Sequence, residues 1–139
     1  MRHSDSSVSS VRSAIMRAVK GRDTGPEKKV RRLLWSVAPG YRLNRADIPG
    51  KPDIAYIARK QAIFVHGCFW HGHDCARGAR APKANAAYWA AKIARNRARD
   101  RLVRHRLKRE GWRALVIWEC ELRDLNAVSR KLERFLGRP

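Results

Sequence analysis

Residues 48–67, IPGKPDIAYIARKQAIFVHG, decide the fold of this chain. Two apolar runs, 53–57 and 61–66, are separated by only three turn-forming residues, and short apolar runs bounded by turns are typical of strands. A further strand is expected at about 41–45, before the Pro- and Gly-containing turn at 48–52. We therefore predict three strands that form an antiparallel meander.

Helical patterns surround these strands. We expect helices over about residues 8–20, 25–38, 85–109 and 124–136. The second begins at Thr24-Gly-Pro-Glu27, which has the pattern of a capping box. The apolar run RALVIWE (113–119) follows the long helix and is typical of a buried strand. A helical crossover makes this strand parallel to 61–66, so we predict an α/β fold with a mixed sheet covered on both faces.

Composition limits the class of protein. The chain has 139 residues, with 32 Lys and Arg against 12 acidic residues and a formal charge of +20, which points to a polyanionic partner. No long uncharged apolar run favours a membrane, and the polar start MRHSDSSVSS lacks the apolar region of a secretory signal. Residues 1–10 are expected to be disordered, and residues 11–139 to form a single domain. Composition alone equally fits a ribosomal-type or other architectural basic protein.

Three cysteines suggest a metal site rather than a disulfide framework, because their number is odd. Cys68 and Cys75 follow the third strand, and Cys120 ends the last one. If these two strands are parallel, their C-terminal ends lie on the same side and the three thiols can reach one ion. Three thiolates and one histidine form the closed set of a structural zinc site. Either histidine of His71-Gly-His73, or Asp74, can complete it; the alternative is a group of reduced, partly buried thiols.

Acidic residues are scarce, and two are candidates for catalysis. Asp53 follows the turn at the start of the second strand, where a solvated turn residue is the alternative. Asp100 lies in the middle of the apolar face of the long helix, where a carboxylate requires a cation or donor; pairing with an arginine is the alternative. His66 ends the strand that pairs with the Asp53 strand. Carboxylates and histidines in so basic a protein suggest metal-assisted phosphodiester hydrolysis, with Mg²⁺ as the ion.

The same motifs resemble those of the very-short-patch repair endonucleases over about residues 11–123. The most specific are Pro49-Gly-Lys-Pro-Asp53, Ile63-Phe-Val-His-Gly-Cys-Phe-Trp-His71 with His73 and Cys75, Tyr88-Trp89, and Val116-Ile-Trp-Glu-Cys120. The resemblance implies a restriction-endonuclease-like, three-layer α/β/α fold with an αβββαβ core. It also implies a Mg²⁺-dependent, strand-specific nick 5′ to the thymine of a T:G mismatch that arises from deamination of 5-methylcytosine.

The resemblance further implies two metal sites. Mg²⁺ would be held by Asp53 and by the backbone carbonyl of Val65. His66 and Asp100 would act through metal-bound water, which Glu27 would join, and His71 would assist at the attacking or leaving oxygen. The structural Zn²⁺ would be held by Cys68, His73, Cys75 and Cys120. The third strand reads IFVHG where this fold usually has an acidic residue and a lysine, so histidine chemistry would replace the lysine.

Contacts with DNA are implied for four residues. Phe69, Trp70 and Trp89 would insert beside the mismatch from the major groove, and Met16, on an N-terminal helix that contacts DNA, from the minor groove. For Trp89 a place in the core is the alternative, and for Trp112 and Trp118 we favour the core.

Further expectations concern partners and location. The expected partners are double-stranded DNA with a T:G mismatch, a MutL-type mismatch-repair protein and a cytosine-5 DNA methyltransferase. The protein is expected to be a monomer and to lie in the bacterial cytoplasm, associated with the nucleoid. A non-catalytic, zinc-stapled DNA-binding module is the alternative function, together with a nuclease of the same fold that acts on another lesion or site.

Overall fold

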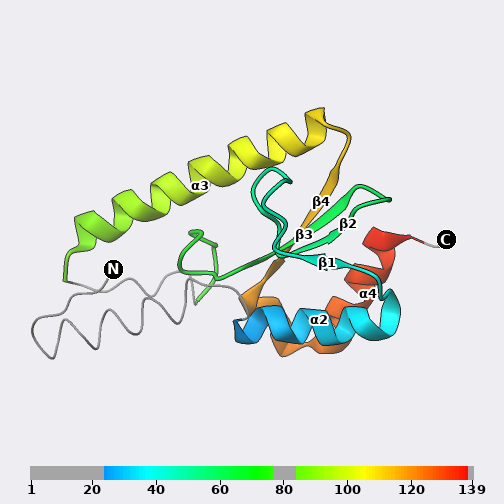
Figure 1. The fold of residues 1–139 in the computed structure, drawn as a ribbon. Helices are drawn as coiled ribbons and strands as arrows, with labels where there is room; N and C mark the ends of the chain where they lie inside the picture. Colours follow the sequence, from blue (N-terminus) through cyan, green and yellow to red (C-terminus); the bar gives the residue numbers. More distant parts are fainter. Residues whose placement is uncertain (1–23, 77–83, 138–139) are drawn as a thin grey trace, which may run out of the picture.

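The strands form one mixed sheet in the computed structural model, which describes residues 24–76 and 84–137. Its elements are α2 (Gly25–Val37), β1 (Arg42–Leu43), β2 (Ile54–Tyr56), β3 (Gln61–His66), α3 (Ala86–Arg109), β4 (Arg113–Trp118), the 3-10 helix η1 (Glu119–Arg123) and α4 (Leu125–Leu136). The sheet order is β1-β2-β3-β4, with the first two pairings antiparallel and β3–β4 parallel. The predicted meander and helical crossover are therefore confirmed (Figure 1).

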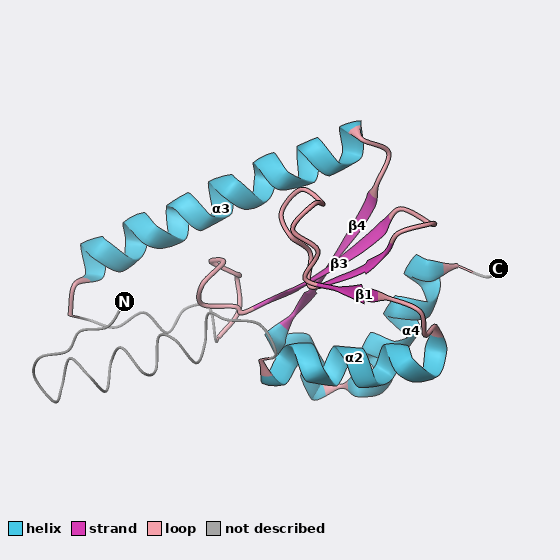
Figure 2. Ribbon diagram, viewed as in Figure 1, coloured by secondary structure: helices cyan, strands magenta, loops and turns pink. Residues whose placement is uncertain are grey.

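Helices cover the two faces of this sheet unequally (Figures 1 and 2). α2 and α4 lie side by side on one face, while α3 crosses the other face alone. This three-layer α/β/α arrangement, with its αβββαβ order, agrees with the restriction-endonuclease-like fold. The expected first helix, Met16 and the N-terminal segment 1–10 lie outside the described residues.

Each face of the sheet has its own apolar cluster because neighbouring strand residues point to opposite sides. Ile63 packs toward α2 and α4 with Leu34, Ile117 and Leu132, among others. The next residue, Phe64, packs toward α3 in a smaller cluster. Its other buried members are Ile48, Ala55, Ala62 and Leu107. Full burial of one such large apolar side chain stabilises the fold by about 1.5–3 kcal/mol, so the face covered by α2 and α4 provides most of the core.

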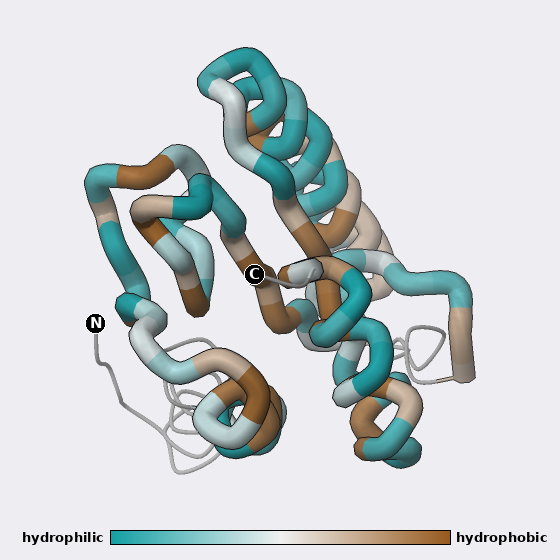
Figure 3. Tube along the Cα trace, turned by 90° about the vertical axis from the view of Figure 1, so that its right-hand side faces the viewer, coloured by the Kyte–Doolittle hydropathy of each residue, from teal (hydrophilic) through white to brown (hydrophobic). Residues whose placement is uncertain are grey.

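α3 contributes little to the core for its length. It has 24 residues, of which only Leu107 is buried, and hydrophilic colours predominate along its C-terminal half in Figure 3. The inward stripe predicted from helical spacing is present, since Ile93, Asn96 and Val103 are half-buried between exposed arginines. No helix among the described residues combines the length and the apolar character needed to cross a membrane.

Local sequence explains where α2 begins and how closely the loop before β2 approaches α3. The Thr24 hydroxyl accepts a hydrogen bond from the Glu27 amide at 3.3 Å, which caps α2 where the capping box predicts. Gly50 has φ +81°, and a Cβ there would lie 2.3 Å from Val103 Cγ1. The loop before β2 can therefore approach α3 only with glycine at this position. This close approach positions Asp53, which lies directly before β2.

Candidate active site and metal centre

The described part of the loop that follows β3, residues 67–76, folds back on itself through backbone hydrogen bonds. The amide of His71 donates to the Gly67 carbonyl at 3.2 Å, and that of His73 donates to the Cys68 carbonyl at 2.9 Å. Gly72 has φ +62°, and a Cβ at this residue would come within 2.8 Å of side chains on α3. This close approach fixes the loop against α3 and directs its histidines to two separate clusters.

The first cluster contains the three cysteines and one histidine. The potential ligand atoms of Cys68, His73, Cys75 and Cys120 all lie within 4.8 Å of one another. The Cys120 amide donates to Cys68 Sγ at 3.4 Å, and Cys120 Sγ lies 3.6 Å from His73 Nδ1. None of the three cysteines is in a disulfide. The parallel pairing of β3 with β4 thus brings Cys120 to the loop, as the spacing predicts.

Thiols in this position suit a soft cation. Burial raises the pKa of Cys68 to about 12, so a protein without a cation would keep this thiol protonated. A bound cation reverses that preference, because it stabilises the thiolate directly. Three sulfur ligands and one imidazole nitrogen at mutual contact distance can hold a tetrahedral metal ion such as zinc. Of the candidates for the fourth ligand, His73 lies in this cluster, His71 lies in the other, and Asp74 is exposed.

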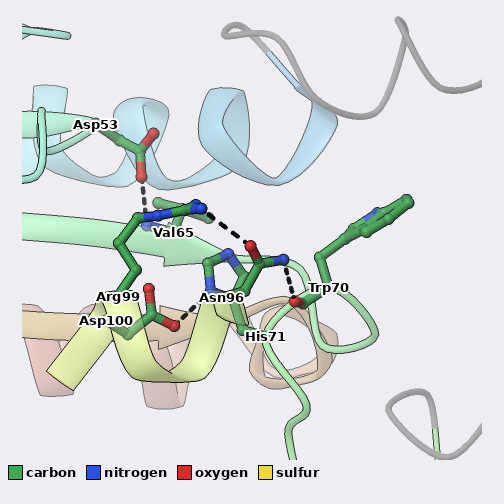
Figure 4. Close-up of polar contacts among 7 residues, drawn as sticks. All are labelled: Asp53, Val65, Trp70, His71, Asn96, Arg99 and Asp100. Atoms are coloured by element: carbon green, nitrogen blue, oxygen red, sulfur yellow. Dashed lines mark hydrogen bonds and ion pairs between the residues drawn. The ribbon is translucent and has the colours of Figure 1, made fainter. Parts of the chain in front are cut away.

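The second cluster joins β3, the loop and α3. Ligand atoms of His66, His71 and Asp100 lie within 4.8 Å of one another. His71 Nδ1 is 2.7 Å from Asp100 Oδ2, and the His66 and His71 rings are stacked, with centroids 3.7 Å apart (Figure 4 shows the His71–Asp100 contact). The inward carboxylate on α3 therefore meets a histidine rather than an arginine.

The charges in this cluster are unequal. Burial, reinforced by the charge of His71, lowers the pKa of His66 to about 4, so the His66 imidazole is neutral at physiological pH. Burial opposes ionisation of Asp100, but the hydrogen bond and charge of His71 outweigh it and lower the pKa of the carboxyl. His66 Nδ1 is buried, and it has no hydrogen-bond partner among the described residues. The cluster thus holds an ionised carboxylate, a histidine bound to it and a neutral histidine with an unused nitrogen.

Asp53 reaches the same strand from β2. Its Oδ2 accepts a hydrogen bond from the Val65 amide at 2.6 Å (Figure 4). Burial is the main reason that the pKa of Asp53 is raised to about 7; the hydrogen bond from Val65 opposes the rise, and the nearby carboxyl of Glu27 adds to it. Glu27 is itself only 5% exposed. Two buried carboxyl groups side by side can both ionise once a hard cation lies between them and compensates their charge.

A cavity of about 310 Å³ lies between the sheet and α3, next to the histidines. Phe64, Val103 and Val116 contribute its apolar wall, and Arg97, Arg101 and Arg104 contribute positive charge from α3. His66, His71, Asp100 and Trp118 also line it. The polar cluster therefore lines a cavity that also carries cationic side chains suited to phosphate.

Aromatic side chains form a separate cluster at the N-terminal end of α3. The ring centroids of Phe69, Trp70 and Trp89 lie 5.0–5.8 Å from one another, and Tyr88 packs against Trp89 at 5.0 Å. The three are half-buried and belong to neither apolar cluster of the core, while Tyr88 is 52% exposed. Trp89 therefore packs on the loop aromatics rather than on the sheet.

Three contacts within the site were not predicted from the sequence. Asn96 Nδ2 donates to the Trp70 carbonyl at 2.8 Å, and Arg99 donates to Asn96 Oδ1 at 3.3 Å (Figure 4). The position of Asn96 on the inward stripe of α3 was the available signal, because an inward amide needs a partner. Trp118, which we assigned to the core, is half-buried and stacks on His73 with centroids 4.0 Å apart. No periodicity in the sequence indicates this contact.

Known proteins are similar to this sequence along most of the chain. The family described as DNA mismatch endonuclease Vsr matches residues 4–77. The type II nicking enzyme V.XorIIP of Xanthomonas oryzae pv. oryzae is 48% identical over 125 residues, which cover 90% of this chain and 91% of that protein. The type II nicking enzyme V.NmeAIP of Neisseria meningitidis is 38% identical, with 91% and 90% covered. The DNA mismatch endonuclease Vsr of Escherichia coli is 38% identical, with 90% and 83% covered.

Three findings agree with one another. The family matches more than half of the chain, a similar relative is named a nicking enzyme, and a carboxylate–histidine cluster lies at the end of β3. The chain belongs to the Vsr family of DNA mismatch endonucleases and is a DNA endonuclease.

Proposed function

We propose that this enzyme nicks duplex DNA on the 5′ side of the thymine in a T:G mismatch and thereby initiates very-short-patch repair. Two observations carry the proposal, in a chain of this family: Asp53 is bound to the Val65 amide near the end of β3, and His71 is bound to Asp100 in a cluster with the neighbouring His66. The Escherichia coli relative, which bears the name DNA mismatch endonuclease, supports mismatched DNA as the substrate. Deamination of 5-methylcytosine is the chemical source of such a mismatch.

Asp53 and the backbone carbonyl of Val65 are proposed to hold Mg²⁺. A bound Mg²⁺ would neutralise the charge that develops on the scissile phosphate. Glu27 lies beside Asp53 and, with His66 and Asp100, would order water around the ion. Asp53 is the best direct ligand because its carboxylate is buried and fixed in place by the Val65 amide.

Proton transfer is assigned to His71. Its Nδ1 is bound to Asp100, which leaves Nε2 to move a proton at the attacking or the leaving oxygen. His66 is neutral and stacked on His71, so it can accept a hydrogen bond from water without adding positive charge. The two histidines therefore have different roles, although their rings are in contact.

Zinc is the ion proposed for the cluster of Cys68, His73, Cys75 and Cys120. The ion would tie the loop after β3 to the end of β4, since the ligands come from both segments. A closed set of four ligands leaves no position for substrate, so the role is structural. This cluster holds the loop that also presents His71.

The aromatic cluster is proposed to open the DNA beside the mismatch. The half-buried rings of Phe69, Trp70 and Trp89, from the loop and α3, contact one another and would enter from one groove, and Met16 would act from the other. Separating one base step costs a few kcal/mol, and a mismatched step opens more easily than a matched one. Discrimination of T:G from T:A would follow from that difference.

The decisive experiment uses a labelled duplex with one T:G mismatch in varied flanking sequence, Mg²⁺, and the matched T:A duplex. We expect a nick on the thymine strand only, abolished in Asp53→Ala. Asp47→Ala is the matched control, because Asp47 is an exposed acid on the preceding loop whose partner is Arg45, 2.8 Å away. Tight binding without cleavage in any context would mean a zinc-stapled DNA-binding module instead. Cleavage confined to another lesion or site would mean a nuclease of the same fold with a different substrate.

The proposed substrate implies further partners. A cytosine-5 DNA methyltransferase would produce the parent base, and a MutL-type repair protein would act on the same lesions. We also propose that the enzyme acts as a monomer on the DNA of the bacterial nucleoid.

A further inference from the structure

The ring of Trp118 lies between the cysteine–histidine cluster and the His66–His71–Asp100 cluster. His73 stacks on it, with centroids 4.0 Å apart and planes inclined by 14°. His66 meets the same indole at 5.2 Å in an edge-on arrangement, and His71 meets it at 6.3 Å. One side chain therefore contacts a potential metal ligand and both histidines of the proposed active site.

Strand pairing and local contacts fix this position. Trp118 is the partner of His66 in the parallel β3–β4 register, so the two side chains lie next to each other on the same face. The Trp118 amide donates to Glu121 Oε1 at 2.8 Å, and Glu121 is bound in turn to Lys131 of α4 at 2.7 Å. The indole is therefore attached to a well-anchored backbone, two residues before the ligand Cys120.

His66 depends on ring contacts for its orientation. Its Nδ1 is buried and has no hydrogen-bond partner in the described part of the chain. Its ring contacts are with Phe64 at 5.8 Å, His71 at 3.7 Å and Trp118 at 5.2 Å. His71 is held by Asp100 as well, so loss of the indole would release His66 first and His71 through the stack.

We propose that Trp118 is a positioning residue that couples occupancy of the Cys68–His73–Cys75–Cys120 site to the orientation of His66 and His71. A bound metal would fix His73, whose ring stacks on the indole, and the same indole contacts both His66 and His71. The catalytic part of this inference rests on the proposed function; the geometric coupling does not. The metal site then has a second role, beyond attaching the loop to β4.

The first test substitutes the ring. In Trp118→Leu we expect one equivalent of zinc to remain bound and T:G duplex affinity to stay within about twofold, while single-turnover nicking falls about 10²-fold, the loss that a misplacement near 1 Å can produce. Trp118→Phe keeps a ring and should restore most of the rate. Trp112→Leu is the matched control, because Trp112 precedes the same strand and packs in the apolar cluster under α3. Nicking by Trp118→Leu at the wild-type rate, with zinc retained, would overturn the proposal.

The second test requires neither nicking nor a stable variant. The full-length protein is compared in its zinc form and after exchange to cadmium, a larger ion, by NMR of the histidine side chains. We expect the resonances of His66 and His71 to shift together with those of His73, while exposed His105 stays unchanged. If only His73 responds, Trp118 transmits nothing and the proposal fails. If the wild-type protein leaves T:G duplexes intact but the three histidines still shift together, the proposed function is refuted and the coupling through Trp118 stands.

Discussion

Asp53 Oδ2 accepts a hydrogen bond from the Val65 amide at 2.6 Å, across the antiparallel pair that β2 and β3 form. This bond holds a carboxylate at the point where β3 ends and the ligand-bearing loop begins. Burial and the nearby Glu27 oppose its ionisation, so the pKa of Asp53 is raised to about 7. The contribution of Asp53 to the free energy of unfolding should therefore decrease as the pH rises and the Asp53 carboxyl is forced to ionise.

The first prediction concerns pH. A carboxyl with a raised pKa in the folded state favours folding fully below its unfolded pKa near 4, and loses that contribution as pH rises to about 7. Without divalent ions, the stability of the wild type relative to Asp53→Asn should fall by a few kcal/mol between pH 4 and 8, because the opposing titration of His66 and Asp100 is common to both proteins. Urea unfolding over this range measures it, and Mg²⁺ should restore stability at pH 8. Parallel pH curves for the two proteins would contradict the prediction.

The second prediction concerns the contact between His71 and Asp100. Asp100→Asn keeps the size of the side chain but removes the charge that orients His71, so nicking of the T:G duplex should fall about 10²- to 10⁴-fold. DNA affinity, measured by fluorescence anisotropy, should change little. Glu110→Gln, which removes an exposed carboxylate just after α3, serves as control and should nick normally. Equal activity of Asp100→Asn and Glu110→Gln would remove Asp100 from the mechanism.

The third prediction concerns the support of the aromatic cluster. Asn96 holds the Trp70 carbonyl at 2.8 Å, and a single such hydrogen bond contributes about 0.5–1.5 kcal/mol, a factor of roughly 2 to 10. Asn96→Ala should therefore reduce the preference for T:G over T:A binding by that factor. Competition binding with both duplexes gives the ratio. Asn126→Ala, at an exposed site on α4, should leave it unchanged, and an unchanged ratio in Asn96→Ala would show that Trp70 needs no such support.

The fourth prediction concerns the cysteine–histidine cluster. His73→Ala should lose most of its bound zinc and several kcal/mol of stability, because binding a structural metal is coupled to folding. Metal analysis and thermal unfolding measure the two effects. His105→Ala removes an exposed histidine from α3 and should retain both zinc and stability. If His73→Ala keeps a full equivalent of zinc, another residue must be the fourth ligand.

The sheet was predictable because its strands are short apolar runs between turn residues, and because a long helix between two strands makes them parallel. The same topology predicted that Cys120 would approach Cys68. The choice of His73 over His71 for that cluster was not predictable from spacing, since it depends on how Gly72 turns the loop against α3. The position of Trp118 also escaped the sequence patterns, because it depends on strand register rather than on hydrophobicity.

The aromatic cluster has a consequence for how such enzymes diverge. Phe69, Trp70 and Trp89 pack on one another and belong to neither apolar cluster that stabilises the sheet. Substitutions there should therefore alter the lesion or sequence preference at little cost in folding, whereas changes at His71, Asp100 or the cysteines affect chemistry or assembly. Selection can thus act on the proposed DNA-reading surface almost independently of the scaffold. A lineage can acquire a new target site without first passing through an unstable intermediate.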